Sequence, residues 1–291
     1  MTSRVGSLMS DPMSGAPTEC DADSHRAIAR ILHDATGISL PEGNGTLIVS
    51  RLIRHLRRLN LPDYAAYVRW ISDPVNAADR AAMITSLTTN TTHFFREGYH
   101  FDIFARDLLP DLRAEAEQGG RIRLWSAGCS SGEEVYSLAA TLLHHWPEAN
   151  QFDLRILATD ISDTALETAS RATYPRAKLE PVPAAIRALM ESETSPEADM
   201  VQMPRRLRDL VTVRHLNFVE PWPTRGPYQA ILCRNVAIYM DQRVQTLLFT
   251  GLADRLAPGG LLFIGHSERL PPSLAPRLKL IDRTTFRNVG S

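Results

Sequence analysis

The chain has 291 residues, 44% of them hydrophobic, and its 32 basic and 33 acidic residues leave a formal net charge of −1. This length suits one large domain with a smaller one, and the charge balance argues against a general nucleic-acid-binding protein. No apolar run approaches the ~18–20 residues that a membrane span needs. The three cysteines are far apart and have no metal-ligand spacing, so we expect free thiols, no metal site and a cytoplasmic protein that does not insert into a membrane.

The N-terminal third is expected to hold a tail and a helical domain. Residues 1–23 are rich in Ser, Pro, Gly and Asp and lack the apolar segment of a signal peptide, which predicts a disordered tail. Residues 24–88 are predicted to be helical throughout. A first helix is expected over His25–Thr36, with Gly37 where a C-cap belongs, and later helices over 62–72 and 77–87.

One predicted helix in this domain, between Gly43 and Pro62, contains no acidic residue. Apolar residues recur at three- and four-residue spacing from Ile48 to Leu59, which gives the helix one core-facing side. The remaining faces carry four arginines within eight residues, which are Arg51, Arg54, Arg57 and Arg58. Two interpretations stay open at this point: a solvated basic helix, or a docking surface for an acidic partner.

From about residue 100 the pattern alternates strands with helices, which predicts an α/β fold with a mostly parallel sheet. Strands are expected at 121–126, 154–159, 228–233, 260–265 and 284–289. Helices are expected at 98–117, 133–145, 163–171 and 241–256. The alternation breaks at 174–210, where prolines are frequent and residues 191–199 are acidic and polar. This stretch predicts an inserted subdomain with a short helix at 184–191.

The most informative motif is the glycine turn Leu124-Trp-Ser-Ala-Gly-Cys-Ser-Ser-Gly-Glu-Glu134, followed by Ala158-Thr-Asp160. Gly128 and Gly132 would let a ligand approach the backbone. No Gly-Lys-Ser/Thr follows, and two glutamates stand where a pyrophosphate would sit, so a phosphate loop is disfavoured. A cationic adenosyl ligand suits these acids better, and S-adenosylmethionine is the candidate. Asp160 is expected to accept hydrogen bonds from the ribose, unless it only caps the next helix.

With these motifs in place, the chain resembles the CheR family of chemotaxis receptor methyltransferases. Matching segments include Thr88-Thr-Asn-Thr-Thr-His-Phe-Phe-Arg-Glu97, the glycine turn, Cys233-Arg-Asn-Val-Ala-Ile-Tyr239 and Gly265-His-Ser-Glu268. The resemblance implies a helical domain at 24–88 and a methyltransferase domain at 89–291. The latter would have a Rossmann-like sheet, with a small β-subdomain inserted at 174–210 that helps to dock the receptor.

The resemblance also implies roles for individual residues. Arg96 and Tyr239 would be catalytic, although the residues alone also allow an ion pair of Arg96 with Glu97 and a packing role for Tyr239. Glu133 is favoured over Glu134 as the acid near the cofactor amino group. The full set of expected cofactor-binding residues is Asn90, Thr92, Arg96, Gly128, Glu133, Asp160, Asn217, Arg234 and Asn235.

The implied activity is O-methylation of glutamate side chains on chemoreceptors, which sets receptor adaptation, with S-adenosylhomocysteine as the second product. The substrate would be the cytoplasmic domain of a chemoreceptor, docked on the four arginines of the basic helix, and the expected oligomeric state is a monomer. Two alternatives stay open: a non-catalytic, cofactor-binding signalling adaptor, and a methyltransferase for another substrate.

Overall fold

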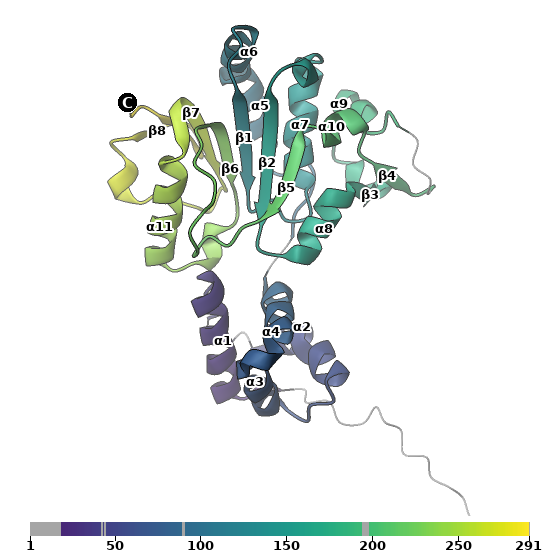
Figure 1. The fold of residues 1–291 in the computed structure, drawn as a ribbon, viewed down its shortest axis with the longest axis vertical. Coiled ribbons are helices and arrows are strands. Elements are labelled where there is room, and N and C mark those ends of the chain that lie inside the picture. The colour runs from purple at the N-terminus through teal and green to yellow at the C-terminus, as the bar shows by residue number, and fades with distance from the viewer. Residues whose placement is uncertain (1–18, 42, 44, 89–90, 194–197, 291) are drawn as a thin grey trace, which may run out of the picture. The chain divides into compact units, whose positions relative to one another are not determined.

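The computed structural model describes residues 19–41, 43, 45–88, 91–193 and 198–290. The chain divides into two compact units, one of Met1–Ala35 with Ser39–Thr88 and one of Thr36–Ile38 with Thr89–Ser291 (Figure 1). Each unit is described by itself. No helix in the described ranges combines the length and the apolar composition needed to cross a bilayer.

The first unit is helical, with α1 (Ala22–Thr36), α2 (Gly45–Arg58), α3 (Tyr64–Ser72), a 3₁₀ turn η1 (Pro74–Asn76) and α4 (Ala77–Leu87). Apolar positions at helical spacing are fully buried, as in α2, where Ile48, Leu52 and Leu56 face the core. Asp63 begins α3 as its N-cap by accepting a hydrogen bond from the Ala66 N–H at 2.7 Å. The predicted helical character of this region is therefore confirmed.

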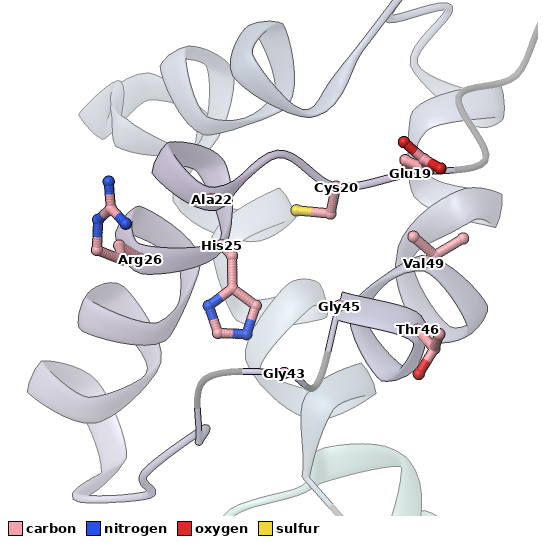
Figure 2. Close-up of a pocket in the computed structure, with 9 residues that line it drawn as sticks. All are labelled: Glu19, Cys20, Ala22, His25, Arg26, Gly43, Gly45, Thr46 and Val49. Carbon is pink, nitrogen blue, oxygen red and sulfur yellow. The ribbon is translucent and has the colours of Figure 1, made fainter.

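A hollow of about 470 Å³ lies in the first unit, lined by the segment before α1, the first turns of α1 and the start of α2 (Figure 2). It contains Cys20, whose pKa is raised to about 11 by burial and by the neighbouring Asp21. This thiol is therefore protonated at neutral pH. None of the residues that line the hollow belongs to the predicted cofactor or docking set.

The second unit is built on a seven-stranded sheet with the order β5-β2-β1-β6-β7-β9-β8. The strands are β1 (Ile122–Ala127), β2 (Leu154–Asp160), β5 (Val211–His215), β6 (Tyr228–Cys233), β7 (Leu256–Ile264), β8 (Leu278–Asp282) and β9 (Thr285–Asn288). Pairing is parallel from β5 to β7, whereas β9 is antiparallel to both β7 and β8. The predicted mostly parallel sheet is thus confirmed, with an antiparallel edge.

Two hydrophobic cores cover the two faces of this sheet. Neighbouring residues of a strand point to opposite faces, and Leu124 of β1 accordingly joins one core while Trp125 joins the other. The first core packs against α5 (Tyr99–Asp107), α6 (Leu109–Glu117) and α7 (Glu133–His145). The second packs against α11 (Gln242–Ala253), so the sheet is held between helices on both sides.

The inserted segment contains less β-structure than a β-subdomain suggests. After α8 (Asp163–Arg171), β3 (Thr173–Pro175) pairs antiparallel with β4 (Met200–Gln202). Between them lie η3 (Arg176–Leu179) and α9 (Ala184–Met190), and α10 (Arg205–Arg208) follows. Apolar residues of the insertion, including Tyr174 and Leu179, are buried in the same core as α7, which ties the insertion firmly to the sheet.

Candidate functional site

The carboxyl ends of β1, β2 and β6 meet at one edge of the sheet, which is where open α/β sheets bind ligands. The glycine turn follows β1 directly. The Gly128 and Cys129 N–H groups both donate to the Thr159 carbonyl at 2.8 Å. Gly128 and Gly132 have φ values of +86° and +98°, a conformation that favours glycine.

Protein atoms fill the space beside these two glycines. Approach of a ligand to the backbone is therefore not the first reason why glycine is needed at these positions. A Cβ on Gly132 would lie 2.5 Å from the Tyr174 hydroxyl, and one on Gly128 would collide with the Val236 side chain. The glycines are therefore required first by backbone conformation and by close packing. Contact of Gly128 with a cofactor stays a prediction.

Asp160 lies at the last position of β2 and is buried. Its carboxylate accepts hydrogen bonds from the Ser130 N–H at 2.8 Å and from the Ser162 N–H at 2.9 Å. Burial raises the pKa of Asp160, and the backbone donors act in the opposite direction. A carboxylate has about four lone-pair sites, so the side chain links the glycine turn to β2 and can still accept a hydroxyl hydrogen bond.

Glu133, at the start of α7, is held by the insertion. Its side chain is fully buried and accepts hydrogen bonds from Lys178 Nζ at 2.5 Å and from Ser131 Oγ at 2.6 Å. Lys178 belongs to η3, and the Tyr174 hydroxyl, also from the insertion, donates to the Ser131 carbonyl at 2.8 Å. The insertion therefore contacts the glycine turn at two points, and Lys178 is a site residue that the sequence analysis missed.

Arg234, just after β6, lies at the centre of a second, buried group of charges. Its side chain is 2% exposed and lies 3.4 Å from Glu97 and 3.3 Å from Glu134. It also donates to the Arg96 carbonyl. The two terminal nitrogens of this guanidinium are therefore committed to protein groups, whereas its buried Nε has no hydrogen-bond partner among the described residues. The geometry favours a supporting role for Arg234 over direct cofactor contact, whereas Asn235, its neighbour, is half-buried.

The charges around Arg234 perturb the nearby titratable groups. Burial alone would raise the pKa of Glu97, but the hydrogen bond from His266 and the charge of Arg234 outweigh it and lower this pKa to about 2. Burial and the charge of Arg234 lower the pKa of His100 to about 3. Burial raises the pKa of Glu134, opposed by Arg234. At neutral pH, His100 is therefore a neutral imidazole beside an ionised Glu97.

Glu268 holds the turn after β6 in place. Its buried carboxylate accepts backbone hydrogen bonds from four N–H groups at 2.6 to 3.0 Å, those of Asn235, Val236, Ala237 and Gly265. Asn235 has a φ of +59°, a conformation uncommon for a residue other than glycine, and the carboxylate stabilises it. Glu268 lies in the Gly265–Glu268 segment of the family pattern, and no role for it was predicted from the sequence.

Arg96 lies on a strained segment beside this turn. Phe95 and Glu97 have φ values of +54° and +53°, and the Phe95 N–H donates to Ser137 Oγ at 3.0 Å. The half-buried Arg96 side chain donates to the Thr91 carbonyl at 3.0 Å. The expected alternative, an ion pair of Arg96 with Glu97, is absent from the described residues, because Glu97 contacts Arg234 and His266 instead.

The remaining predicted residues are placed as follows. Thr92 is half-buried, and Tyr239 is half-buried in the 3₁₀ turn η4 (Ala237–Tyr239). Asn217 is buried after β5, where its Nδ2 donates to Glu220 Oε1 at 3.0 Å. Asn90 lies outside the described residues. Their contacts with a cofactor stay predictions.

The arginines of α2 divide into two kinds. Arg51 donates to the Ser86, Leu87 and Thr88 carbonyls at 2.8 to 3.2 Å, and thus satisfies the end of α4. Arg58 pairs with Asp79 at 2.6 Å. Arg54 and Arg57 are exposed and have no hydrogen-bond or ion-pair partner among the described residues. Arg51 is therefore a structural residue, and the docking prediction rests mainly on Arg54 and Arg57.

No metal site accompanies these groups: within the described ranges, no three His, Cys, Asp or Glu side chains gather in a way that could hold a metal ion. Cys129, in the glycine turn, is buried, and burial together with the nearby Asp160 raises its pKa well above the usual value. This thiol is therefore an inert packing residue rather than a nucleophile.

Comparisons with known proteins match the chain over nearly all of its described length. The family model described as "CheR methyltransferase, SAM binding domain" matches residues 90–286, and that described as "CheR methyltransferase, all-alpha domain" matches residues 24–88. The chain is 38% identical to a probable chemotaxis protein methyltransferase of Rhizobium etli, over 88% of this chain and 96% of that protein. It is 39% identical to chemotaxis protein methyltransferase 2 of Pseudomonas aeruginosa, over 81% and 83% of the two chains. Its identity to the chemotaxis protein methyltransferase of Escherichia coli is 34%, over 91% of both.

Proposed function

The chain belongs to the CheR methyltransferase family of S-adenosylmethionine-dependent enzymes, and we propose that its acceptor is a glutamate carboxylate of a chemoreceptor. Family membership confirms the enzyme class and the cofactor predicted from the sequence. The acceptor atom, the receptor and the roles of individual residues are the proposal. The observation that carries it is the buried Arg234, which joins the turn after β6 to the Arg96 backbone.

The residues at the sheet edge fit the cofactor. The ligand is a cation with ribose hydroxyls, and this edge gathers the carboxylates of Glu133, Glu134 and Asp160 around the glycine turn. Asp160 keeps acceptor capacity for the ribose, and the proposal assigns the amino groups of the cofactor to Glu133 and Asn217. A pyrophosphate would meet like charge at the same positions. These carboxylates therefore favour a sulfonium ligand over a pyrophosphate.

Bound here, S-adenosylmethionine supplies a methyl group on a positively charged sulfur. The acceptor glutamate has a reference pKa of about 4.3 and is already ionised at neutral pH, so a carboxylate oxygen forms the new C–O bond while the C–S bond breaks. No proton is transferred, and the products are a methyl ester and a neutral thioether. The neutral, buried His100 is therefore not required as a general base.

The protein then has to position the acceptor and exclude water. Arg96 presents a planar fork of donors that suits a carboxylate, and its backbone is fixed by Arg234. Tyr239 extends from η4 directly after the turn that Glu268 organises, where its phenol would form a wall for the methyl group and acceptor. Both roles follow the family pattern, and the fixed backbone supports them.

We propose that the receptor docks on the two exposed arginines of α2 that have no partner among the described residues. Arg54 and Arg57 have no acidic partner among the described residues, so they can steer and hold an acidic helix of the receptor at little desolvation cost. The proposal includes a cytoplasmic, monomeric enzyme that acts at the inner face of the membrane. No observation favours a non-catalytic adaptor over this enzyme.

The direct test is methyl transfer from radiolabelled S-adenosylmethionine to receptor-containing membranes. Arg96→Ala should abolish base-labile labelling of receptor glutamates, and Arg96→Lys should restore little of it, because a lysine lacks the bidentate fork. The control is Arg113→Ala, which breaks an exposed ion pair with Glu117 on α6 and should leave transfer unchanged. Cofactor binding without labelling of any matched receptor would refute the proposed acceptor.

A further inference from the structure

A groove on the sheet face that carries α11 has no assigned role; it reaches the carboxyl ends of β2 and β5 at Thr159 and His215, but none of the predicted cofactor-binding residues lines it. Figure 1 shows α11 beside β6 and β7, whereas β2 and β5 carry no helix on that face among the described residues. The connection from β5 to β6 likewise contains no described helix. The groove has a volume of about 420 Å³ and is lined by residues of β1, β2, β5 and the segment that leads into β6.

The groove combines an apolar floor with positive charge. Leu157 and Thr212 pair across β2 and β5, and Leu216 and Tyr228 add apolar surface. The charged lining residues are Arg123, Arg155 and Arg214, with His215 beside them, and none of the described lining residues is acidic. A chain with a net charge of −1 therefore concentrates positive charge at this site.

Two of these arginines lack an acidic partner. Arg123 pairs with Asp153 at 2.7 Å. Arg155 and Arg214 are exposed, and each donates to the carbonyl of the residue before it, at 2.6 and 2.8 Å. Neither makes an ion pair within the described ranges. Their guanidinium groups are thus available for carboxylates, which they bind in a bidentate manner.

The spacing of the groove residues specifies the partner. Arg214 is in register with Thr159, four residues after Arg155, so the two arginines stand about 13 Å apart along the strand direction at ~3.3 Å per residue. Leu157 lies midway on the same face of β2. An extended peptide places residues i, i+2 and i+4 on one face, so two acids at i and i+4 with an apolar residue at i+2 match the three positions.

We propose that this groove binds an extended, acidic protein segment of the pattern Glu-x-Leu-x-Glu. Tyr228 is buried and its hydroxyl is bonded to Thr224, so the described lining offers no exposed aromatic ring on which a nucleotide base could stack. The strand N–H groups lie in the plane of the sheet rather than on its face, so the groove lacks a backbone cradle for phosphate. Both points favour a peptide over a nucleotide.

The probe is a fluorescein-labelled peptide, Ser-Glu-Ser-Leu-Ser-Glu-Ser, titrated with the full-length protein and followed by fluorescence anisotropy. Arg155→Gln and Arg214→Gln should each weaken binding about five- to tenfold, and more when combined, because each removes one charge-assisted contact. The matched control is the double variant Arg113→Gln/Arg243→Gln, which removes the same charge from α6 and α11. Thermal unfolding and methyl transfer should be unchanged in all variants, since neither Arg155 nor Arg214 is a predicted cofactor-binding residue.

Two further peptides and one competitor decide the specificity. Replacing the central Leu by Ser, or moving the second Glu to i+3, should weaken binding to the wild-type protein several-fold, and added salt should weaken it further. Absence of binding by the wild type, or equal binding by the wild type and the groove double variant, would overturn the proposal. So would equal affinity for the Ser-substituted peptide, or displacement of the peptide by ATP at lower concentrations than by unlabelled peptide.

Discussion

The ion pair between Lys178 and Glu133 yields an asymmetric prediction. Removing the lysine by Lys178→Met should destabilise the protein more than neutralising the acid by Glu133→Gln. The reason lies in the exposure of the two side chains: Glu133 is fully buried, whereas Lys178 is 44% exposed. A lysine without its partner can turn to water, but a buried carboxylate without its partner cannot.

The magnitudes follow from the contacts. Breaking a buried pair from one side costs about 3–5 kcal/mol, and the partial exposure of Lys178 reduces this to about 2–3 kcal/mol for Lys178→Met. The Ser131 hydroxyl still donates to the carboxylate at 2.6 Å. In Glu133→Gln the amide oxygen can still accept from Lys178 and the amide N–H can donate to the Ser131 hydroxyl oxygen, so the expected loss is about 1 kcal/mol or less. Once Glu133 is replaced by Gln, Lys178→Met should cost almost nothing more, which gives a coupling energy of about 2–3 kcal/mol.

The assay is urea unfolding of the wild type, both single variants and the double variant at one pH and salt concentration. Arg176→Met is the matched control, because Arg176 lies in the same turn η3 and pairs with Glu191 through a side chain that is 53% exposed. It should cost at most about 1 kcal/mol. The reasoning is refuted if Lys178→Met costs no more than Glu133→Gln, or if the two changes add to within about 0.5 kcal/mol.

Other predictions follow from the remaining contacts. Glu268→Gln should lower the free energy of unfolding by about 2–4 kcal/mol and the methyl-transfer rate with it, because an amide cannot accept from all four N–H groups; unchanged urea midpoint and rate would contradict this. His100 has its pKa lowered to about 3, so the unfolded chain takes up a proton near pH 6.5 before the folded protein does, and stability falls as the pH drops from about 6.5 towards 3. His100→Gln should flatten this part of the stability profile, measured by unfolding at pH 7.5 and 5; a profile parallel to that of the wild type would refute the assignment. Arg54→Ala/Arg57→Ala should raise the KM for receptor several-fold at low salt and leave cofactor affinity unchanged, whereas Arg51→Ala should instead lower the free energy of unfolding by about 1–2 kcal/mol.

Long periodic segments of the fold could be predicted from the sequence, and so could the four-residue strand β9, whereas two strands with an exposed, polar side could not. Helices α4, α7 and α8 begin and end at the expected residues, since their apolar spacing and flanking residues agree. Strands β5 and β8 were missed, because each has an exposed, polar side. The single helix expected over 98–117 is two helices that meet at Leu108, two residues before Pro110, which cannot donate a helical hydrogen bond.

Strand β7 also differs from the sequence prediction, at the turn expected before it. A strand was expected from residue 260, after the Pro258-Gly-Gly260 turn, but β7 begins at Leu256 and contains this segment. The register against β6 jumps from the pair of Tyr228 and Leu256 to the pair of Ala230 and Leu261, so the Pro258–Gly260 segment of β7 has no partner on β6. The local turn signal therefore marks the place where β7 leaves its pairing with β6 before it resumes at Leu261.

At the candidate site, residues with a local signal were found and their partners were not. Asp160 and the glycine turn follow strand ends, so their position at the sheet edge could be inferred from the pattern. Lys178 lies 45 residues from Glu133 along the chain, and Glu268 lies more than 30 residues from the turn that it holds. Only the folded chain brings such groups together. That such partners are needed could nevertheless be inferred from the sequence, because a buried acid requires a cation or several hydrogen-bond donors.

This requirement changes the interpretation of the acids near the cofactor. Glu133 was expected to face a cationic ligand, and in the folded protein it already has a cation of the chain's own, Lys178 at 2.5 Å. A carboxylate offers about four lone-pair sites, of which Lys178 and Ser131 use two. Because Glu133 is fully buried, the amino group of the cofactor would share it with the insertion only once the covering side chains move. Such sharing would couple cofactor binding to the insertion, so Lys178→Met should weaken cofactor affinity, whereas Arg176→Met should not.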